Sequence, residues 1–301
     1  MLKANKSGGA STNSLPAPVR PRVETAFAEP RNFLGNRFIY VVISQRARGL
    51  SVGVNMNPDQ TCNFNCVYCE VKRNGPPRDQ RVNINVMAAE LKRTLAWVQE
   101  GKLQEMACYQ TVPEELLQLR EVALSGDGEP TLCPNFAEIV QALVHLRAQA
   151  QFPFFRIVLI TNGTGLHLPT VQRGLRWFTA RDEIWAKLDA GSQGYLEKVN
   201  RTNLSLDKIL ANLLQIGRQR PIVVQSLFCQ LQDKEPPPKE IEHYVHRLAE
   251  LKAGGAAISL VQIYSAHRPT ALSECRHLSL HCLSRIAQQV REEAGLEAEV
   301  F

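Results

Sequence analysis

Three cysteines form the densest group of reactive side chains in the chain. Cys62, Cys66 and Cys69 lie within the string DQTCNFNCVYCEV at spacings of three and two residues. Structural zinc usually has four Cys or His ligands in two pairs, but the next histidine downstream is His145, in a segment with helical spacing. A cubane iron–sulfur cluster held by three thiolates leaves one iron open to a small molecule. The pattern favours such a cluster, and zinc with an external fourth ligand stays open.

Polar residues mark three further stretches, the first two of which contain glycine: SGDGEPT (125–131), TNG (161–163) and KLD (187–189). Glycine permits close approach of a backbone to a ligand, and carboxylate and amide oxygens accept hydrogen bonds from an amine or a hydroxyl. A tight turn that ends at Pro130 is the alternative interpretation of the first stretch. Lys187 and Asp189 are two residues apart and therefore share one face of a strand.

The elements that must position these residues follow from the hydrophobic pattern. Unbroken runs of β-branched residues favour strands that are buried on both faces, and their alternation with helices favours a parallel sheet with right-handed crossovers. We therefore predict an incomplete (β/α)6 TIM-like barrel with a C-terminal helix. The predicted strands are 51–56, 121–126, 155–161, 183–189, 221–228 and 257–265, and the predicted helices are 86–99, 136–149, 168–179, 206–217, 240–252 and 278–295.

The cysteine string and the three polar stretches follow the first four predicted strands in order. In parallel α/β folds, ligand sites lie beyond the carboxyl ends of the strands. We therefore expect the four loops to meet at one mouth of the barrel.

The C-x3-C-x2-C string, with Tyr68 just before the last cysteine, resembles the signature of the radical S-adenosylmethionine (radical SAM) superfamily. The stretch SGDGEPT resembles the Gly-Gly-Glu element of that superfamily, and the resemblance covers about residues 50–265. It implies that Cys62, Cys66 and Cys69 hold a [4Fe–4S] cluster whose open iron binds S-adenosylmethionine. The implied cofactor-binding residues are Tyr68, Gly126, Asp127, Gly128, Glu129, Asn162, Lys187, Asp189 and Gln225.

The resemblance also implies a reaction. Reductive cleavage of S-adenosylmethionine would give methionine and a 5′-deoxyadenosyl radical, which abstracts a hydrogen atom from a substrate. The implied partner is a one-electron donor such as flavodoxin or ferredoxin. In this scheme Tyr68 lies by the adenine, Lys187 neutralises the methionine carboxylate, and Asn162 and Asp189 contact the ribose or order the site. Cys229, at the end of the fifth predicted strand, is a candidate catalytic thiol, and a packed cysteine is the alternative.

The strings KLDAGSQGYLEKVNRTN and VQIYSAHRP resemble the branch that contains the tRNA-wyosine synthases and uncharacterised bacterial iron–sulfur oxidoreductases. The tRNA enzymes of that branch hold a second cluster with cysteines upstream of the signature, whereas this chain has no cysteine before Cys62. RNA modification and chemistry on a peptide or small molecule therefore both stay open. A basic set could bind an anionic substrate: Lys72, Arg73, Arg78, Arg81, Arg201 and Arg268.

Charge and composition bound the remaining choices. Residues 1–48 carry eight basic and two acidic side chains, which account for the whole net charge of +6. We predict a disordered basic tail (1–36), which could contact RNA, and one core domain (37–301). Apolar runs are too short for a membrane span, and crowded free cysteines fit a reducing cytoplasm. The competing class is a non-catalytic iron–sulfur or zinc protein, such as a sensor or an RNA adaptor.

Overall fold

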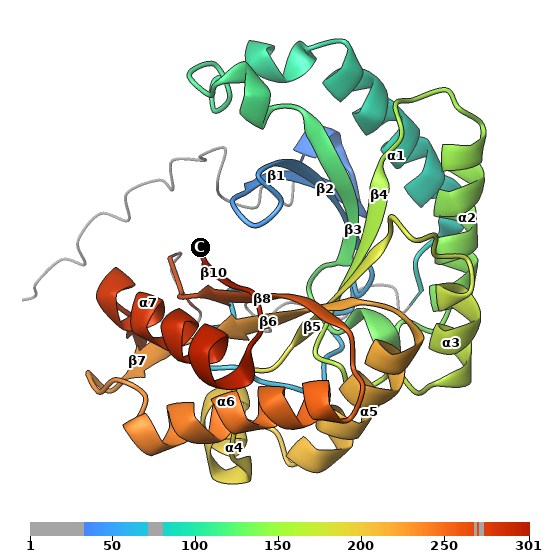
Figure 1. Cartoon of the computed structure of the whole chain (residues 1–301). Coiled ribbons are helices and arrows are strands. Elements are labelled where there is room, and N and C mark those ends of the chain that lie inside the picture. The colour runs from blue at the N-terminus through green and yellow to red at the C-terminus, as the bar shows by residue number, and fades with distance from the viewer. Residues whose placement is uncertain (1–32, 72–80, 268–269, 271–273) are drawn as a thin grey trace, which may run out of the picture.

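A curved sheet organises the fold (Figure 1). The computed structural model describes residues 33–71, 81–267, 270 and 274–301. The strands are β1 (Ile39–Ser44), β2 (Gly49–Asn55), β3 (Leu119–Ser125), β4 (Arg156–Thr161), β5 (Glu183–Lys187), β6 (Ile222–Leu227), β7 (Cys229–Leu231), β8 (Ile258–Tyr264), β9 (Cys275–His277) and β10 (Ala298–Val300). The main sheet has eight strands in the order β1-β2-β3-β4-β5-β6-β8-β10.

The predicted parallel barrel is confirmed. Strands β2, β3, β4, β5, β6 and β8 are the predicted strands, and each pairs with its neighbour in parallel. The pattern did not predict β1, which pairs antiparallel with β2 at one edge, or β10, which extends the other edge. Strands β7 and β9 form a separate antiparallel pair. The fold is therefore the expected incomplete barrel with an added strand at each edge.

Helices cover the outside of the curved sheet (Figure 1). Side chains cap several of them: the Asn83 side chain accepts a hydrogen bond from the backbone of Val86, and Ser205 caps the helix after it in the same way. The helices are α1 (Ile84–Gln99), α2 (Phe136–Ala148), α3 (Pro169–Leu175), α4 (Gln193–Asn200), α5 (Leu206–Gln219), α6 (Pro238–Ala253) and α7 (Leu280–Gln289), which a π turn (Val290–Ala294) extends. Short 3₁₀ turns lie at Phe33–Gly35, Lys102–Glu105, Glu114–Leu116 and Pro130–Leu132.

Strand alternation divides the barrel strands into two faces. Residues such as Ile184, Ala186 and Val224 belong to the main hydrophobic core. Their neighbours along the strands point the opposite way, into the barrel. The interior set includes polar side chains: Lys187 is paired in register with Gln225, and Gln225 with Gln262. The fold therefore buries polar groups inside the barrel.

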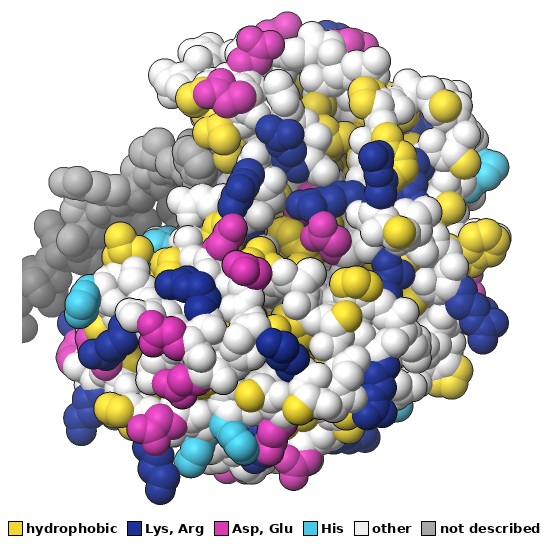
Figure 2. Space-filling model, viewed as in Figure 1, with side chains coloured by type: hydrophobic (Ala, Val, Ile, Leu, Met, Phe, Trp, Pro, Cys, Tyr) yellow, Lys and Arg dark blue, Asp and Glu magenta, His cyan; other side chains and the backbone are white. Residues whose placement is uncertain are grey.

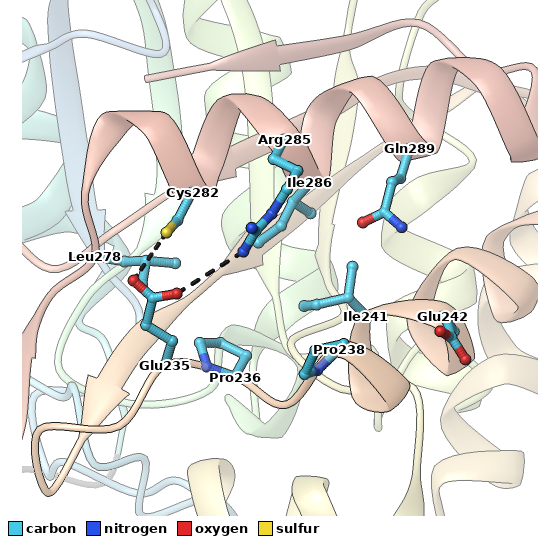
Figure 3. A pocket seen from close by; sticks show the side chains of 10 residues that line it. All are labelled: Glu235, Pro236, Pro238, Ile241, Glu242, Leu278, Cys282, Arg285, Ile286 and Gln289. Atoms are coloured by element: carbon cyan, nitrogen blue, oxygen red, sulfur yellow. Dashed lines mark hydrogen bonds and ion pairs between the residues drawn. The ribbon is translucent and has the colours of Figure 1, made fainter.

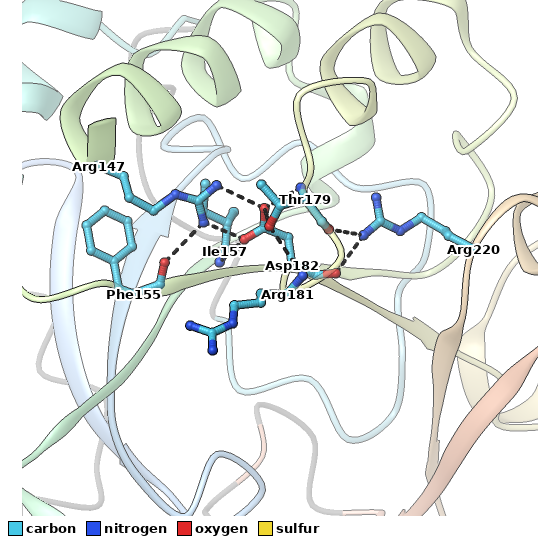
Figure 4. A network of polar contacts seen from close by, with 7 residues as sticks. All are labelled: Arg147, Phe155, Ile157, Thr179, Arg181, Asp182 and Arg220. Carbon is cyan, nitrogen blue, oxygen red and sulfur yellow. Dashed lines mark hydrogen bonds and ion pairs between the residues drawn. The ribbon is translucent and has the colours of Figure 1, made fainter. Parts of the chain in front are cut away.

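A buried ion pair ties α2 to the start of β5 (Figure 4). Arg147 donates two hydrogen bonds to the Asp182 carboxylate, at 2.6 and 3.0 Å, and both side chains are buried. The same carboxylate accepts from the backbone N–H groups of Ile157 and Thr179, at 2.7 Å each. Burial alone would raise the pKa of Asp182, but these hydrogen bonds lower it below its usual value. The carboxylate is therefore charged and structural.

One ion pair links the two edges of the sheet, and others join neighbouring strands. In Figure 2, basic and acidic side chains alternate in the middle of the face, over the β1–β2 turn and β10. Arg48 in that turn pairs with Glu299 on β10 at 2.7 Å, and Arg156 pairs with Glu121 and Glu183. Both partners of the Arg48 pair are exposed, so this pair adds little stability by itself.

The expected tail lies mostly outside the described residues, which begin at residue 33. Its last residues belong to the fold, because Phe33 is 1% exposed and packs in the main core. The packed region therefore starts before the expected boundary at residue 37. Among the described residues, no helix is long and apolar enough to cross a membrane.

Candidate active site

The cysteine loop follows β2 and is fixed through its backbone. The N–H of Asn65 donates to the carbonyl of Asn200 at 3.0 Å, and the N–H of Val67 donates to the carbonyl of Val199 at 2.9 Å. These bonds attach the loop to the last residues of α4, the helix that follows β5. Cys62, Cys66 and Cys69 are all partly buried. The loop therefore lies at the carboxyl end of the barrel strands, as expected.

The GDGE loop after β3 packs directly against the cysteine loop. The N–H of Glu129 donates to the Thr61 carbonyl at 3.0 Å. A Cβ added at Gly128 would lie 2.1 Å from that carbonyl oxygen, and one added at Gly126 would lie 2.2 Å from the Asn55 side chain. Gly126 also has φ +129°, a conformation that favours glycine. The two glycines therefore permit close contact between protein segments, whatever they do for a cofactor.

The Glu129 side chain holds two loops together. It is 3% exposed, and its carboxylate accepts hydrogen bonds from the Thr131 hydroxyl at 2.6 Å and from the Asn162 backbone at 2.7 Å. Burial raises the pKa of this carboxyl, although these hydrogen bonds oppose the rise. The Asn162 amide donates to Asn63 in the cysteine loop at 2.8 Å. Glu129 and Asn162 therefore order the mouth, and their contacts with a cofactor stay predictions.

A polar network lies beside the central cysteine. The Tyr68 hydroxyl donates to the Asp189 carboxylate, and the Lys187 ammonium lies 3.2 Å from that hydroxyl and 4.5 Å from the ring centroid. The Asn200 amide donates to Asp189 at 2.8 Å and to the Cys66 sulfur at 3.3 Å. Three residues of the predicted set are thus in contact: Tyr68, Lys187 and Asp189.

Asn200 is a site residue that the sequence analysis did not identify. It is fully buried at the end of α4, and its only sequence signal is the string KVNRTN. The next residue, Arg201, has φ +47°, which ends the helix. The polar residue at that helix end was visible in the sequence, but its contact with Cys66 depends on the tertiary fold.

The protein environment of Cys66 fits a bound metal cluster. Burial raises the pKa of the Cys66 thiol to about 11, and Lys187 and the Asn200 amide act to lower it. A coordinating metal deprotonates a thiol outright, so cluster binding would supply the stabilisation that burial removes. Thiolates are the ligands of iron–sulfur clusters. Among the described residues, no group of three His, Cys, Asp or Glu surrounds a single metal ion, whereas a cubane distributes its thiolates over separate irons.

Gln225 adds a second observation in favour of a ligand. Its side-chain nitrogen donates to Gln262 at 2.8 Å, and its Oε1 is buried and has no hydrogen-bond partner in the part of the chain that the structure describes. A buried carbonyl oxygen without a partner costs about 1–3 kcal/mol. A bound molecule that donates a hydrogen bond there would remove this cost.

Cys229 lies above the barrel interior, in strand β7. It packs in one hydrophobic cluster with Tyr68, Leu227 and Tyr264, and it is hydrogen-bonded to Cys275 on β9. The bond to Cys275 and burial raise the pKa of Cys229. Its side chain is 1% exposed, so the thiol is protonated and shielded from solvent.

The basic set lies partly outside the described residues, which exclude Lys72, Arg73, Arg78 and Arg268. Arg201 pairs with Glu274 at 2.5 Å. One further pocket, between the start of α6 and α7, is lined by Glu235, Cys282 and Arg285 among others (Figure 3). Cys282 donates to Glu235 at 2.9 Å there. None of its lining residues belongs to the predicted site.

Comparison with known proteins identifies the family. The family model of the radical SAM superfamily matches residues 56–222, more than half of the chain. The chain therefore belongs to the radical SAM superfamily, whose enzymes use a [4Fe–4S] cluster and S-adenosylmethionine.

Individual relatives are distant. A UPF0026 protein of Helicobacter pylori is 27% identical over 185 residues, which are 60% of this chain and 52% of that protein. The chain thus spans about half the length of such curated relatives.

Among solved structures, a radical SAM methyltransferase from Sphaerobacter thermophilus has TM-score 0.59 and 16% identity, with 87% of this chain and 68% of that chain covered. TYW1 with a lysine-pyruvate adduct bound has TM-score 0.54 and 15% identity, with 85% and 84% covered. At these identities the likeness shows the fold.

Proposed function

We propose that this protein is a radical enzyme that holds a [4Fe–4S] cluster with Cys62, Cys66 and Cys69 and cleaves S-adenosylmethionine to generate a 5′-deoxyadenosyl radical. The observation that carries the proposal is the meeting of the cysteine loop, the GDGE loop and the Lys187–Asp189 pair at one end of the barrel. A cluster held by these cysteines would supply the one electron that breaks a carbon–sulfur bond of the sulfonium, which would give methionine and the radical that takes a hydrogen atom from a substrate.

The chain's own residues bind and orient the cofactor in this proposal. Lys187 offers a positive charge to the methionine carboxylate. Burial alone would lower the pKa of its ammonium, but Tyr264 and Asp189 beside it raise the pKa above its usual value. The lysine is therefore charged at neutral pH. The Gln225 side-chain oxygen, which has no hydrogen-bond partner among the described residues, offers an acceptor to the cofactor.

The backbone of the mouth completes the cofactor site. In this proposal the backbone of Gly126, Asp127 and Gly128 lines the cofactor beside the cysteine loop, and the Asp127 N–H is held by the Asn55 side-chain oxygen at 3.0 Å. Asp189 holds Tyr68 in place, so that its ring can lie by the adenine.

Cys229 is the candidate hydrogen-atom donor. Its raised pKa keeps the S–H bond intact, which is the form that can give a hydrogen atom to a substrate radical and become a thiyl radical. Its cluster includes Tyr68, which borders the predicted cofactor site. The electron donor would be a flavodoxin or ferredoxin in a reducing cytoplasm, and the folded domain of residues 37–301 would carry the activity.

The test is anaerobic reconstitution of the full chain with iron and sulfide, followed by dithionite and S-adenosylmethionine. We expect about four irons and four sulfides per chain and formation of 5′-deoxyadenosine. Cys69→Ala should lose both, whereas the matched control Cys108→Ala, a half-buried cysteine of another segment, should keep both. One zinc per chain would favour a structural metal site. A full cluster that binds S-adenosylmethionine without cleaving it would favour a sensor or an RNA adaptor.

A further inference from the structure

The turn between β1 and β2, residues 45–48, lies inside the curve of the sheet (Figure 1). Ala47 in this turn is buried and packs with Val158, Trp185 and Val223. These partners come from β4, β5 and β6, and they share the interior face because the residues beside them belong to the outer core. The turn therefore enters the barrel interior.

Arg46 extends from this turn to the far side of the barrel. Its guanidinium carbon lies 4.2 Å from the centroid of the Tyr264 ring, at the carboxyl end of β8. A cation over the face of an aromatic ring is attracted by it. This contact therefore holds the Arg46 guanidinium against Tyr264, below the mouth.

This cation has no anionic partner within the described part of the chain. No carboxylate there lies within ion-pair distance of Arg46, and its Nε is buried without a hydrogen-bond partner. Arg46 is partly buried, and because arginine cannot release its proton in a protein, this side chain keeps its charge there. Its planar donors match the two oxygens of a carboxylate or phosphate. The arrangement therefore suits a bound oxyanion.

A second cation lies close by. Burial acts to lower the pKa of the Lys187 ammonium, Tyr264 raises it, and the Arg46 guanidinium opposes that rise, so the two cations act on each other inside the barrel. In the proposed function Lys187 neutralises the one carboxylate of S-adenosylmethionine. The positive charge of Arg46 can then pair with an anionic group of a second molecule, the substrate.

The sequence position of Arg46 supports a role in substrate choice. The family match covers residues 56–222, so both Arg46 and Tyr264 lie outside it. The three cysteines and all but Gln225 of the predicted cofactor-binding residues fall within that region.

We propose that Arg46 binds an oxyanion, a carboxylate or a phosphate, on a small-molecule substrate inside the barrel, an inference that rests on the proposed radical chemistry for its substrate role. Arg46 is partly buried inside the curve of the sheet and Ala47 packs beside it, so a bound group must enter the barrel to reach the guanidinium. This favours a small molecule over the phosphate backbone of an RNA.

The test is anion protection of Arg46 in the full, cluster-free chain. Phenylglyoxal modifies arginine side chains, and peptide mass spectrometry measures the rate of modification at Arg46. The rate in sodium phosphate and the rate in sodium succinate are each compared with the rate in sodium chloride of equal ionic strength. At ten times its dissociation constant, an anion at Arg46 should slow modification about tenfold, whereas the exposed Arg176 should react unchanged. Stronger protection by phosphate would identify a phosphate site, and stronger protection by succinate would identify a carboxylate site. Equal modification in all three salts would overturn the proposal.

Matched variants give a second readout. The effective anion should raise the melting temperature of the wild type and of Arg48→Met, which changes an exposed arginine of the same turn. It should not raise that of Arg46→Met, which keeps an apolar stem over Tyr264. An equal rise in Arg46→Met would overturn the proposal.

The two proposals fail separately. In reconstituted protein, protection of Arg46 by S-adenosylmethionine, with phosphate displacing it, would assign Arg46 to the cofactor and overturn its substrate role. Anion protection without any 5′-deoxyadenosine formation would overturn the radical chemistry and leave the anion site supported.

Discussion

Gly128→Ala tests whether the GDGE loop positions the cysteine loop through direct packing. The new Cβ would lie 2.1 Å from the Thr61 carbonyl oxygen and 2.6 Å from the Asn57 Cβ. Both distances are far below contact, and the first neighbour is backbone, so the two loops must separate. Gly128 does not have a positive φ, and the effect is therefore steric rather than conformational.

The cost can be worked out from two contributions. Forcing an extra carbon into packed structure costs about 1–3 kcal/mol. Separating the loops also breaks the 3.0 Å bond from the Glu129 N–H to the Thr61 carbonyl, a net loss of about 1 kcal/mol. We expect the free energy of unfolding to fall by about 2–4 kcal/mol. With a urea slope of about 3 kcal/mol/M for a domain of this size, the midpoint should fall by about 1 M.

The assay is urea unfolding of the cluster-free chain, followed by iron analysis after reconstitution. Gly194→Ala is the matched control, because an added Cβ there has no neighbour within 4 Å and alanine favours a helix by about 1 kcal/mol. Gly128→Ala should lower both the midpoint and the iron content, whereas Gly194→Ala should keep the iron content and should not lower the midpoint. A Gly128→Ala protein with the wild-type midpoint and full iron would refute the packing argument and leave the glycine a role at the cofactor only.

Three further predictions concern buried polar groups. Arg147→Met should lower the free energy of unfolding by about 3–5 kcal/mol because it leaves Asp182 buried without its cation, while Arg181→Met, at an exposed residue, should change it little. The pKa of Asp182 is lower in the folded protein than its usual value. The ionised Asp182 therefore stabilises the fold at pH values above the usual pKa, and this stabilisation is lost as the pH falls through the folded pKa. Chemical denaturation from pH 6 to 2 should show this loss in the wild type and less of it in Arg147→Met. Asn200→Leu removes the N–H donor to Cys66 and should raise the pKa of that thiol above about 11. In the cluster-free variant, iodoacetamide at pH 8 should therefore alkylate Cys66 several-fold more slowly than in the wild type. An unchanged alkylation rate would contradict the hydrogen bond from Asn200 to Cys66.

The repeating part of the fold could be predicted because its pattern is local. Runs such as FRIVLIT need burial on both faces, and the helical segments between them carry apolar residues at helical spacing. Strand β1 has an equally apolar sequence, IYVVIS, but no helix follows it, so it does not fit the strand–helix alternation. Strands β7, β9 and β10 have three residues each and give no readable period.

The site could be predicted where chemistry and spacing coincide in one short segment. The three cysteines and the GDGE stretch meet this condition. Asn200 and Arg46 do not, because each acts through a contact with a residue more than 100 positions away, Cys66 for one and Tyr264 for the other. No local pattern distinguishes Asn200 from an ordinary helix end, or Arg46 from any arginine in a turn.

The contacts around the cysteine loop explain how one scaffold can keep its cofactor site while its substrate changes. The loop is held on one side by the carbonyls of Val199 and Asn200, and on the other by the bond from Glu129 to Thr61. These are backbone bonds, so they depend on the path of the chain more than on side-chain identity. The groups that face the barrel interior are side chains on separate strands and on the β1–β2 turn. A substitution such as one at Arg46 can therefore alter what the interior binds without moving the backbone that supports the cysteines.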